Sequence, residues 1–358
     1  MSAPRPLVLA SSRVSPDVPA EVASGQRPRL DVLAVAQALD ADVLDTQASD
    51  RLPRWQRRLE AALATDWSQA RAARSRRGLC SAYLSTSEKV GLPLALQGVD
   101  VPHVLIAHNL MTARKRRLHR MTGVLRRFDA IICLSATQEE YLRGEVGLEA
   151  GRVHRVWDGV DQQFFRPSAG EGAQGDYLLA VGRENRDYQT LVKAARRAGL
   201  PLTIVASSLW SRHGVGLDPD ALPPNVTLRR DFVSYPELRT LYENARLVVV
   251  PLAPCDYAAG VNGVLEAMAM GKASVVTQTN GLAEYVQDGV TNRTVPPGDV
   301  EALADALRSL WADEAARRAL GTQGRARVER EMSMDAYAAR LTAIVRQAIE
   351  NEQGDWRL

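Results

Sequence analysis

Short apolar runs alternate with segments of helical periodicity along the first half of the chain. The runs Leu7 to Ala10, Val104 to Ala107 and Ala130 to Leu134 have the length of buried strands. In Leu30 to Leu39 and Ala136 to Leu142, apolar residues recur every three or four positions, as they do in amphipathic helices. This alternation predicts βαβ units built on a parallel sheet.

The same pattern starts again after the loop Arg166 to Asp176, which is rich in Gly, Ser and Ala. A new strand is expected at Tyr177 to Val181. Further strands are expected at Leu202 to Val205, Val226 to Leu228, Leu247 to Pro251 and Ala273 to Thr277, and a helix at Pro236 to Ala245. The sequence therefore predicts a second α/β domain.

Two helical patterns, Ala302 to Trp311 and Met334 to Asn351, close the chain. The second of them can fold back onto the first domain. We therefore expect two Rossmann-like domains that face each other across a cleft, at residues 1–167 and 168–340. A C-terminal helix and tail, residues 341–358, would cross back to the first domain.

Composition narrows the class of protein. The 358 residues are 46% hydrophobic and 24% charged, as in an ordinary globular enzyme. No apolar stretch reaches the roughly 20 residues that span a bilayer, and the first thirty residues lack an apolar signal core, so a cytoplasmic location is expected. The scattered Cys80, Cys133 and Cys255 predict reduced thiols, without a disulfide framework or a zinc site.

Positive charge is concentrated in the first half. Residues 1–167 hold 24 Lys and Arg against 18 Asp and Glu, whereas residues 168–358 hold 21 against 24. The cations cluster at Arg54, Arg57 and Arg58, at Arg71, Arg74, Arg76 and Arg77, and from Arg114 to Arg127. A solvated helix face explains this spacing, and an anionic acceptor or peripheral contact with a membrane is the alternative. Binding to nucleic acid is not expected, because we expect no aromatic side chains among these arginines that could stack on bases.

Two arginines follow the first strand of the second domain. Ligands of open α/β sheets lie beyond the carboxyl ends of the strands. Arg183 and Arg186 follow the strand Tyr177 to Val181, and guanidinium groups bind phosphate oxygens in pairs. These residues are therefore candidate ligands of a phosphate group.

A glycine-bracketed turn, Gly260 to Gly263, then leads into a short helix, and the free N–H groups at such a helix start bind anions. Glu266, one turn into that helix, can accept hydrogen bonds from both hydroxyls of a ribose. Together with the two arginines, these features point to a nucleoside diphosphate.

The run Gly263 to Lys272, followed by Val275 to Thr277 and Asn280 to Glu284, resembles the donor-site motif of family 4 retaining glycosyltransferases of the GT-B fold. Further similar segments are Asp158 to Asp161 with Phe165 and Pro167, Gly182-Arg183 with Arg186, and Asp288 to Asp299. The resemblance is strong over residues 100–345 and weak over the first hundred.

The resemblance implies a role for each matching residue. The donor diphosphate would be bound by Arg183, Arg186, Gly263 and the backbone amides of Val264 and Leu265, the ribose by Glu266, the base by Phe232 and Val233, and the sugar side by Gly25, Asn262, Asn280 and Gly281. Arg186 stands where the family usually has Lys. Gly25 and either Arg27 or Arg29 replace the family's glycine-rich first loop.

One acidic residue of the family pattern is missing. The family has paired glutamates, and the position of the first corresponds to Ala258 in this chain. Asp256 is the candidate substitute, and the alternative is that it is an exposed loop carboxylate. The change implies a different sugar preference or a lost catalytic contact.

The first domain offers two further candidate catalytic residues. His108 follows the strand Val104 to Ala107, where the family has a histidine beside the donor sugar. Glu88 is either a general base or an acid at a helix N-terminus. His103 and His119 are interpreted as structural or solvated.

No carboxylate pair of the metal-binding kind follows a strand, so we expect neither a metal ion nor another cofactor. The arginines and a helix dipole would neutralise the leaving diphosphate. The implied reaction is a retaining transfer from a nucleotide sugar, with UDP the commonest nucleotide, to a hydroxyl group of a small molecule or natural product. The alternative acceptor is a membrane glycolipid or polysaccharide precursor. A GT-B epimerase or phosphorylase, and a non-catalytic nucleotide-sugar-binding protein, remain rival functions.

Overall fold

The computed structural model describes residues 4–50, 52–168, 175–206 and 216–355. The chain forms two compact units. The first comprises Met1–Pro19, Arg29–Val156 and Asp335–Leu358, and the second comprises Ala20–Pro28 and Trp157–Met334. The chain thus passes between the units after residues 19, 28, 156 and 334, whereas boundaries were expected at 167 and 340.

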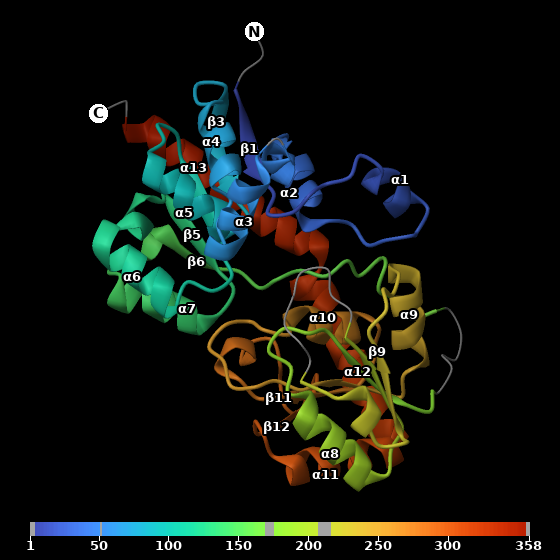
Figure 1. The fold of residues 1–358 in the computed structure, drawn as a ribbon. Coiled ribbons are helices and arrows are strands. Elements are labelled where there is room, and N and C mark those ends of the chain that lie inside the picture. The colour runs from blue at the N-terminus through green and yellow to red at the C-terminus, as the bar shows by residue number, and fades with distance from the viewer. Residues whose placement is uncertain (1–3, 51, 169–174, 207–215, 356–358) are drawn as a thin grey trace. The chain divides into compact units, whose positions relative to one another are not determined.

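Within the described residues, the first unit is built on a parallel six-stranded sheet with the order β2-β1-β3-β4-β5-β6 (Figure 1). Its strands are β1 (Arg5–Leu9), β2 (Asp42–Leu44), β3 (Cys80–Ser85), β4 (His103–Ala107), β5 (Ala130–Cys133) and β6 (Val153–Arg155). All residues of β4 and β5 are buried. Burial on both faces explains why these strands are continuous apolar runs.

The helices of the first unit connect these strands and include the last helix of the chain. They are α2 (Asp31–Leu39), α3 (Arg54–Leu63), α4 (Trp67–Arg74), α5 (Glu88–Gln97), α6 (Ala113–Thr122), α7 (Ala136–Glu140) and α13 (Met334–Asp355). Helix α13 is tied to this unit by an Arg29–Asp335 ion pair of 2.6 Å. The expected return of the C-terminal helix to the first domain is therefore confirmed.

The second unit has its own parallel sheet, with the order β12-β11-β10-β7-β8-β9 among its described strands. These are β7 (Leu178–Val181), β8 (Leu202–Val205), β9 (Val226–Arg229), β10 (Leu247–Val250), β11 (Ser274–Thr277) and β12 (Arg293–Val295). The strand order reverses between β7 and β10. The carboxyl ends of these two strands therefore form the switch point where open sheets bind ligands.

The helices of the second unit cover both faces of its sheet. They are α8 (Tyr188–Ala198), α9 (Tyr235–Asn244), α10 (Val261–Ala269), α11 (Val300–Ala312) and α12 (Glu314–Arg327). Helix α10 is apolar on nearly all sides because it is buried in the core, with Val264 and Met268 fully covered. This packing fixes the direction of the start of α10.

The two units confirm the expected α/β class with Rossmann-like halves. Helix α1 (Val18–Ala23) overlaps the segment Ala20–Pro28, which belongs to the second unit. Across the described residues, none of the helices has the length and apolar character needed to cross a bilayer.

Candidate active site

The loops that follow β7 and β10 are hydrogen-bonded to each other at the switch point. Asn185 Nδ2 donates to Ala253 O at 2.8 Å, and Ala253 N donates to Asn185 O at 3.1 Å. Asp187 N donates to Pro251 O at 3.1 Å. The backbone of Asn185 is left-handed, with φ of +53°, a conformation that asparagine tolerates better than most residues. The arginine-bearing loop is therefore held rigidly beside α10.

Arg186 lies against the N-terminus of α10. Its Nε donates to Val181 O at 3.0 Å and its Nη1 to Glu184 O at 2.9 Å. A Cβ atom added at Gly260 would lie 3.1 Å from Arg186 Nη1, and Gly260 is the N-cap of α10, without a side chain that could cap it. A guanidinium cation and the positive end of a helix dipole are thus held together, which creates an anion site.

The other residues expected at the diphosphate surround this point. Gly182, with φ of +106°, turns the chain at the end of β7, and Arg183 follows it with its side chain half-buried. Gly263 lies on the same side of α10, since a Cβ there would be 3.7 Å from Arg186 Nη2. The side chains of Val264 and Leu265 are buried in the core, and the Val264 amide donates to Gly260 O at 3.2 Å.

Glu266 lies one turn farther along α10. Tyr242 Oη of α9 donates to Glu266 Oε2 at 2.7 Å. Burial raises the pKa of Glu266 to about 7, although the Tyr242 hydroxyl and Arg186 both favour the ionised form. This carboxyl group therefore titrates near neutral pH.

Arg27 joins the same surface from the segment Ala20–Pro28. Its guanidinium group lies over the Tyr235 ring, 5.6 Å from the centroid, and its Nη1 pairs with Glu21 at 3.1 Å. Burial raises the pKa of Tyr235, while Arg27 lowers it and Glu266 raises it, so these side chains interact beside α10. Arg29, the other cation expected here, pairs instead with Asp335 in the first unit.

Two of the candidate sugar-side residues are in direct contact. Asn280 Nδ2 donates to Asp256 Oδ1 at 2.9 Å, and both side chains are exposed. A Cβ at Gly281 would lie 1.9 Å from Tyr257 O, so only glycine lets these two loops pack. Tyr257 Oη in turn donates to Glu184 Oε1 at 3.2 Å. Polar groups therefore gather beside the position where the family's first glutamate is missing.

Most of the remaining donor-side candidates are exposed to solvent. Phe232, between β9 and α9, is 67% exposed, while the neighbouring Val233 packs on the core. Asn262 is exposed in the first turn of α10. Gly25, with φ of +71°, turns the chain after α1, and nothing lies within 4 Å of where its Cβ would be.

In the first unit, His108 and Glu88 occupy the carboxyl edge of the sheet. His108 Nε2 contacts Thr86 O at 3.0 Å, which places a proton on Nε2 because a carbonyl oxygen only accepts. The Glu88 carboxylate is buried and accepts from Asn109 N at 2.6 Å. Burial acts to raise the pKa of Glu88, but Lys115, His108 and the Asn109 amide outweigh it and lower the pKa.

A carboxylate held in this way is a poor proton acceptor. Ser87 caps α5 by accepting from Lys89 N at 3.2 Å, so Glu88 is also the acid in the first turn of a helix. The geometry therefore favours a positioning role, in which Glu88 fixes the backbone next to His108, over general-base catalysis.

His103 and His119 serve the fold. His103 is fully buried against Ser85 Oγ at 2.8 Å, and burial lowers its pKa to about 3, which keeps it neutral. His119 Nδ1 accepts from Leu125 N at 3.2 Å. The cysteines are free thiols, and the described parts of the chain bring together no group of three or more His, Cys, Asp or Glu suited to a metal ion.

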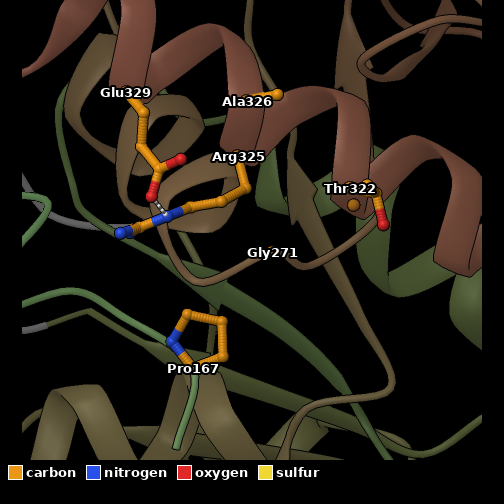
Figure 2. A pocket seen from close by; sticks show the side chains of 7 residues that line it. Pro167, Gly271, Thr322, Arg325, Ala326 and Glu329 are labelled. Atoms are coloured by element: carbon orange, nitrogen blue, oxygen red, sulfur yellow. Dashed lines mark hydrogen bonds and ion pairs between the residues drawn. The ribbon is translucent and has the colours of Figure 1, made fainter.

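A hollow of about 340 Å³ lies at the opposite end of α10 from Arg186 (Figure 2). Pro167 and Gly271 line it together with residues of α12 and the turn that follows. Figure 2 shows Arg325 paired with Glu329, at 2.7 Å, and Arg325 Nη1 also donates to Phe165 O and Ala269 O. The guanidinium group is thus used to join segments of the second unit, so we do not place the donor here.

Comparison with known proteins identifies the family of the chain. The chain matches the family described as "Glycosyltransferase Family 4" over residues 29–164 and "Glycosyl transferases group 1" over residues 176–313. It is 28% identical over 283 residues to the alpha-maltose-1-phosphate synthase of Mycobacterium tuberculosis, which covers 68% of this chain and 72% of that protein.

Solved structures share the fold. The sucrose-phosphate synthase of Thermosynechococcus elongatus superposes with a TM-score of 0.70 at 22% identity, over 97% of this chain and 100% of the other. Anabaena Alr3699/HepE in complex with UDP and glucose gives 0.64 at 16% identity, over 98% and 100%. Together with the family matches, these findings show that the chain belongs to glycosyltransferase family 4 and is a GT-B glycosyltransferase that uses a nucleotide-sugar donor.

Proposed function

We propose that this enzyme transfers a sugar from a nucleoside diphosphate, UDP first among them, to a hydroxyl group of a small acceptor, with retention of configuration and without a metal ion. The observation that carries the proposal is the pairing of Arg186 with the N-terminus of α10. Two positive groups held in contact are stabilised by an anion, and a diphosphate supplies the matching charge.

The proposed contacts to the rest of the donor are placed relative to Arg186 and the N-terminus of α10. Arg183 lies at the end of the same strand as Arg186, and Glu266 is one turn of α10 away, where its carboxylate can accept from ribose hydroxyls. Phe232 and Val233 would contact the base, and Arg27 adds a cation on the same surface. A protein with the same fold has been solved in complex with UDP and glucose, so UDP is the first nucleotide to test.

The proposed chemistry is mainly electrostatic. As the bond from the anomeric carbon to the diphosphate oxygen breaks, negative charge develops on the diphosphate and positive charge on the sugar ring. The two arginines and the helix dipole stabilise the first. The acceptor oxygen bonds to the anomeric carbon on the face that the diphosphate leaves, and the proton of its hydroxyl passes to the departing diphosphate. His108 is proposed as a sugar contact, and Glu88 as the residue that positions it.

Asp256 is proposed to replace the missing first glutamate at the donor sugar. It is two residues before Ala258, exposed, and oriented by Asn280. We expect Asp256→Ala to lower kcat/KM for the nucleotide sugar by about ten- to a hundredfold, the value of one or two hydrogen bonds to a charged group. The affinity for the free nucleoside diphosphate should stay unchanged.

Steady-state kinetics with Asp256→Ala, compared with Asp305→Ala on the surface of α11, checks this expectation. Asp305 is also an exposed carboxylate with a polar partner, Arg308. Equal activity of the two variants would show that Asp256 is only a loop carboxylate.

The acceptor is proposed to be a small sugar or polyol. The relative from Mycobacterium tuberculosis is named for its product, the small phosphorylated sugar maltose 1-phosphate. Phosphorylated sugars are therefore the first acceptors to screen. The excess of cations in residues 1–167 suits such an acceptor electrostatically. A membrane glycolipid is the second candidate, favoured by the exposed surface of α3 described below.

The proposal is tested by calorimetry and thermal shift with UDP, GDP, ADP, dTDP and their sugars, with and without EDTA. We expect saturable binding of one nucleoside diphosphate that EDTA does not change and that Glu266→Ala weakens. Loss of binding in EDTA would refute metal independence alone. Absence of binding by every nucleotide would refute the donor assignment.

A further inference from the structure

Helix α3 in the first unit presents its apolar side chains to solvent. Trp55 is 63% exposed, Leu59 51% and Leu63 44%, and they follow each other at intervals of four residues along one face. Trp67, at the start of α4, is 45% exposed. A surface helix normally turns such a stripe toward the core, so its exposure requires an explanation.

The same helix is attached to the unit through its polar side. Gln56 and Glu60, also four residues apart, are half-buried, while none of the residues of α3 is fully buried. The Glu60 carboxylate accepts from Ser68 N at 2.7 Å and from Ser68 Oγ at 3.0 Å. The orientation of α3 is therefore fixed by specific hydrogen bonds, with its apolar face outward.

Exposed arginines flank the apolar stripe. Arg54, Arg57 and Arg58 are all exposed. With 3.6 residues per turn, Arg54 and Arg58 lie on the flank opposite Gln56 and Glu60, whereas Arg57 lies on the side of the helix away from Trp55. Trp55 stands within this cluster, which corrects the expectation that the arginine clusters lack aromatic residues. A helix with tryptophan and leucine on one face and arginines beside it has the chemistry of an interfacial membrane helix.

The segment that follows α3 is hydrogen-bonded to the helix that begins with Glu88. Asp66 N, three residues after the end of α3, donates to Lys89 O at 2.8 Å. Lys89 is in the first turn of α5, next to Glu88. The turn that follows α3 is therefore attached to the start of α5, at the carboxyl edge of the first sheet where His108 also lies.

We propose that α3, together with Trp67, docks the first unit on a membrane surface rich in anionic lipid. The arginines complement the negative headgroups, and the indole rings and leucines insert at the level where headgroups meet acyl chains. This inference does not depend on the donor nucleotide or on the acceptor, because it rests only on the exposed face of α3.

The test is co-sedimentation of the full chain with vesicles of phosphatidylcholine, either pure or mixed with phosphatidylglycerol. We expect binding to the mixed vesicles only, weakened by salt. The variant Trp55→Gln/Leu59→Gln/Leu63→Gln should reduce the partition coefficient at least tenfold. Arg54→Gln/Arg57→Gln/Arg58→Gln should reduce it by about fivefold per arginine.

Matched control variants make the test specific for α3. Arg114→Gln/Arg117→Gln/Arg120→Gln removes the same number of exposed cations from α6, and Met121→Gln removes a side chain that is 74% exposed. Circular dichroism should show that all variants keep the native melting temperature within a few degrees, since the replaced side chains are exposed.

Several outcomes would overturn the proposal. These are no binding to mixed vesicles, equal binding to pure phosphatidylcholine, or an equal loss of binding in the α6 variants. A self-association that the apolar variant abolishes, without vesicle binding, would assign α3 to an interface between copies. Salt-sensitive binding to RNA but not to vesicles would assign the arginines to nucleic acid.

Discussion

Replacing Arg186 by alanine is expected to lower kcat about 10²- to 10³-fold, because a preorganised cation that stabilises the charge of a leaving group contributes on this scale. Arg186 donates to Val181 O and Glu184 O, so its guanidinium group is fixed before any ligand binds. Adding EDTA or Mg²⁺ should leave the activity of both the native enzyme and the variant unchanged. Product formation from the nucleotide sugar identified by the binding screen provides the measurement.

Two further variants show whether the loss of activity is due to the loss of the charge at position 186. Arg186→Lys should retain activity within about tenfold, since the resembled family usually has lysine at this position and the charge is kept. Arg318→Ala, at an exposed arginine of α12, should behave as the native enzyme. Full activity of Arg186→Ala would instead place the leaving diphosphate away from the N-terminus of α10.

Glu266→Gln is expected to weaken the binding of the nucleoside diphosphate by about ten- to a hundredfold, as a neutral amide replaces a carboxylate that accepts from ribose hydroxyls. Isothermal titration calorimetry at pH 8 measures this change. Because the pKa of Glu266 in the free enzyme is raised to about 7, the native affinity should fall as the pH is lowered through 7. The ratio of the two dissociation constants should approach one at pH 5.5.

The same substitution should change the pH dependence of stability. A carboxyl group whose pKa is raised on folding stabilises the fold at low pH, and this contribution is lost as the pH rises from the unfolded value toward 7. Glu266→Gln stays neutral, so its melting temperature relative to the native enzyme should increase between pH 5 and pH 8.

Tyr242→Phe provides the control for this titration. Tyr242 Oη donates to Glu266 and favours the ionised form, so its removal should move the midpoint of the affinity change to higher pH. A pH-independent ratio of dissociation constants for native enzyme and Glu266→Gln would contradict the assignment of Glu266 to the ribose.

Local patterns along the chain were sufficient for the fold class and for most elements of the two sheets. The buried strands β4, β5 and β10 are continuous apolar runs, which parallel sheets require, and they were predicted to within one or two residues. The three-residue edge strands β2, β6 and β12 gave no such signal, since so short a run has no measurable period. The resemblance to family 4 followed from residues close together in sequence.

The chemistry of individual groups depended on contacts that no local pattern contains. Burial raises the pKa of Glu266 to about 7, and the hydrogen bond from Tyr242, 24 residues away, acts to lower it. Glu88 has a lowered pKa because Asn109 and Lys115 surround its carboxylate. Arg27 lies over the Tyr235 ring, whereas Arg29 is engaged by Asp335.

The periodicity of a segment shows which side chains share a face of a helix, but packing decides which face is covered. In α3 the sequence shows an apolar stripe beside a cluster of arginines. Only the hydrogen bonds from Ser68 to Glu60 show that the polar side is attached and that the stripe is left outside. The sequence by itself thus determined the elements and the donor motif, whereas the tertiary structure decided the orientation, protonation and exposure of the groups, because these depend on neighbours distant along the chain.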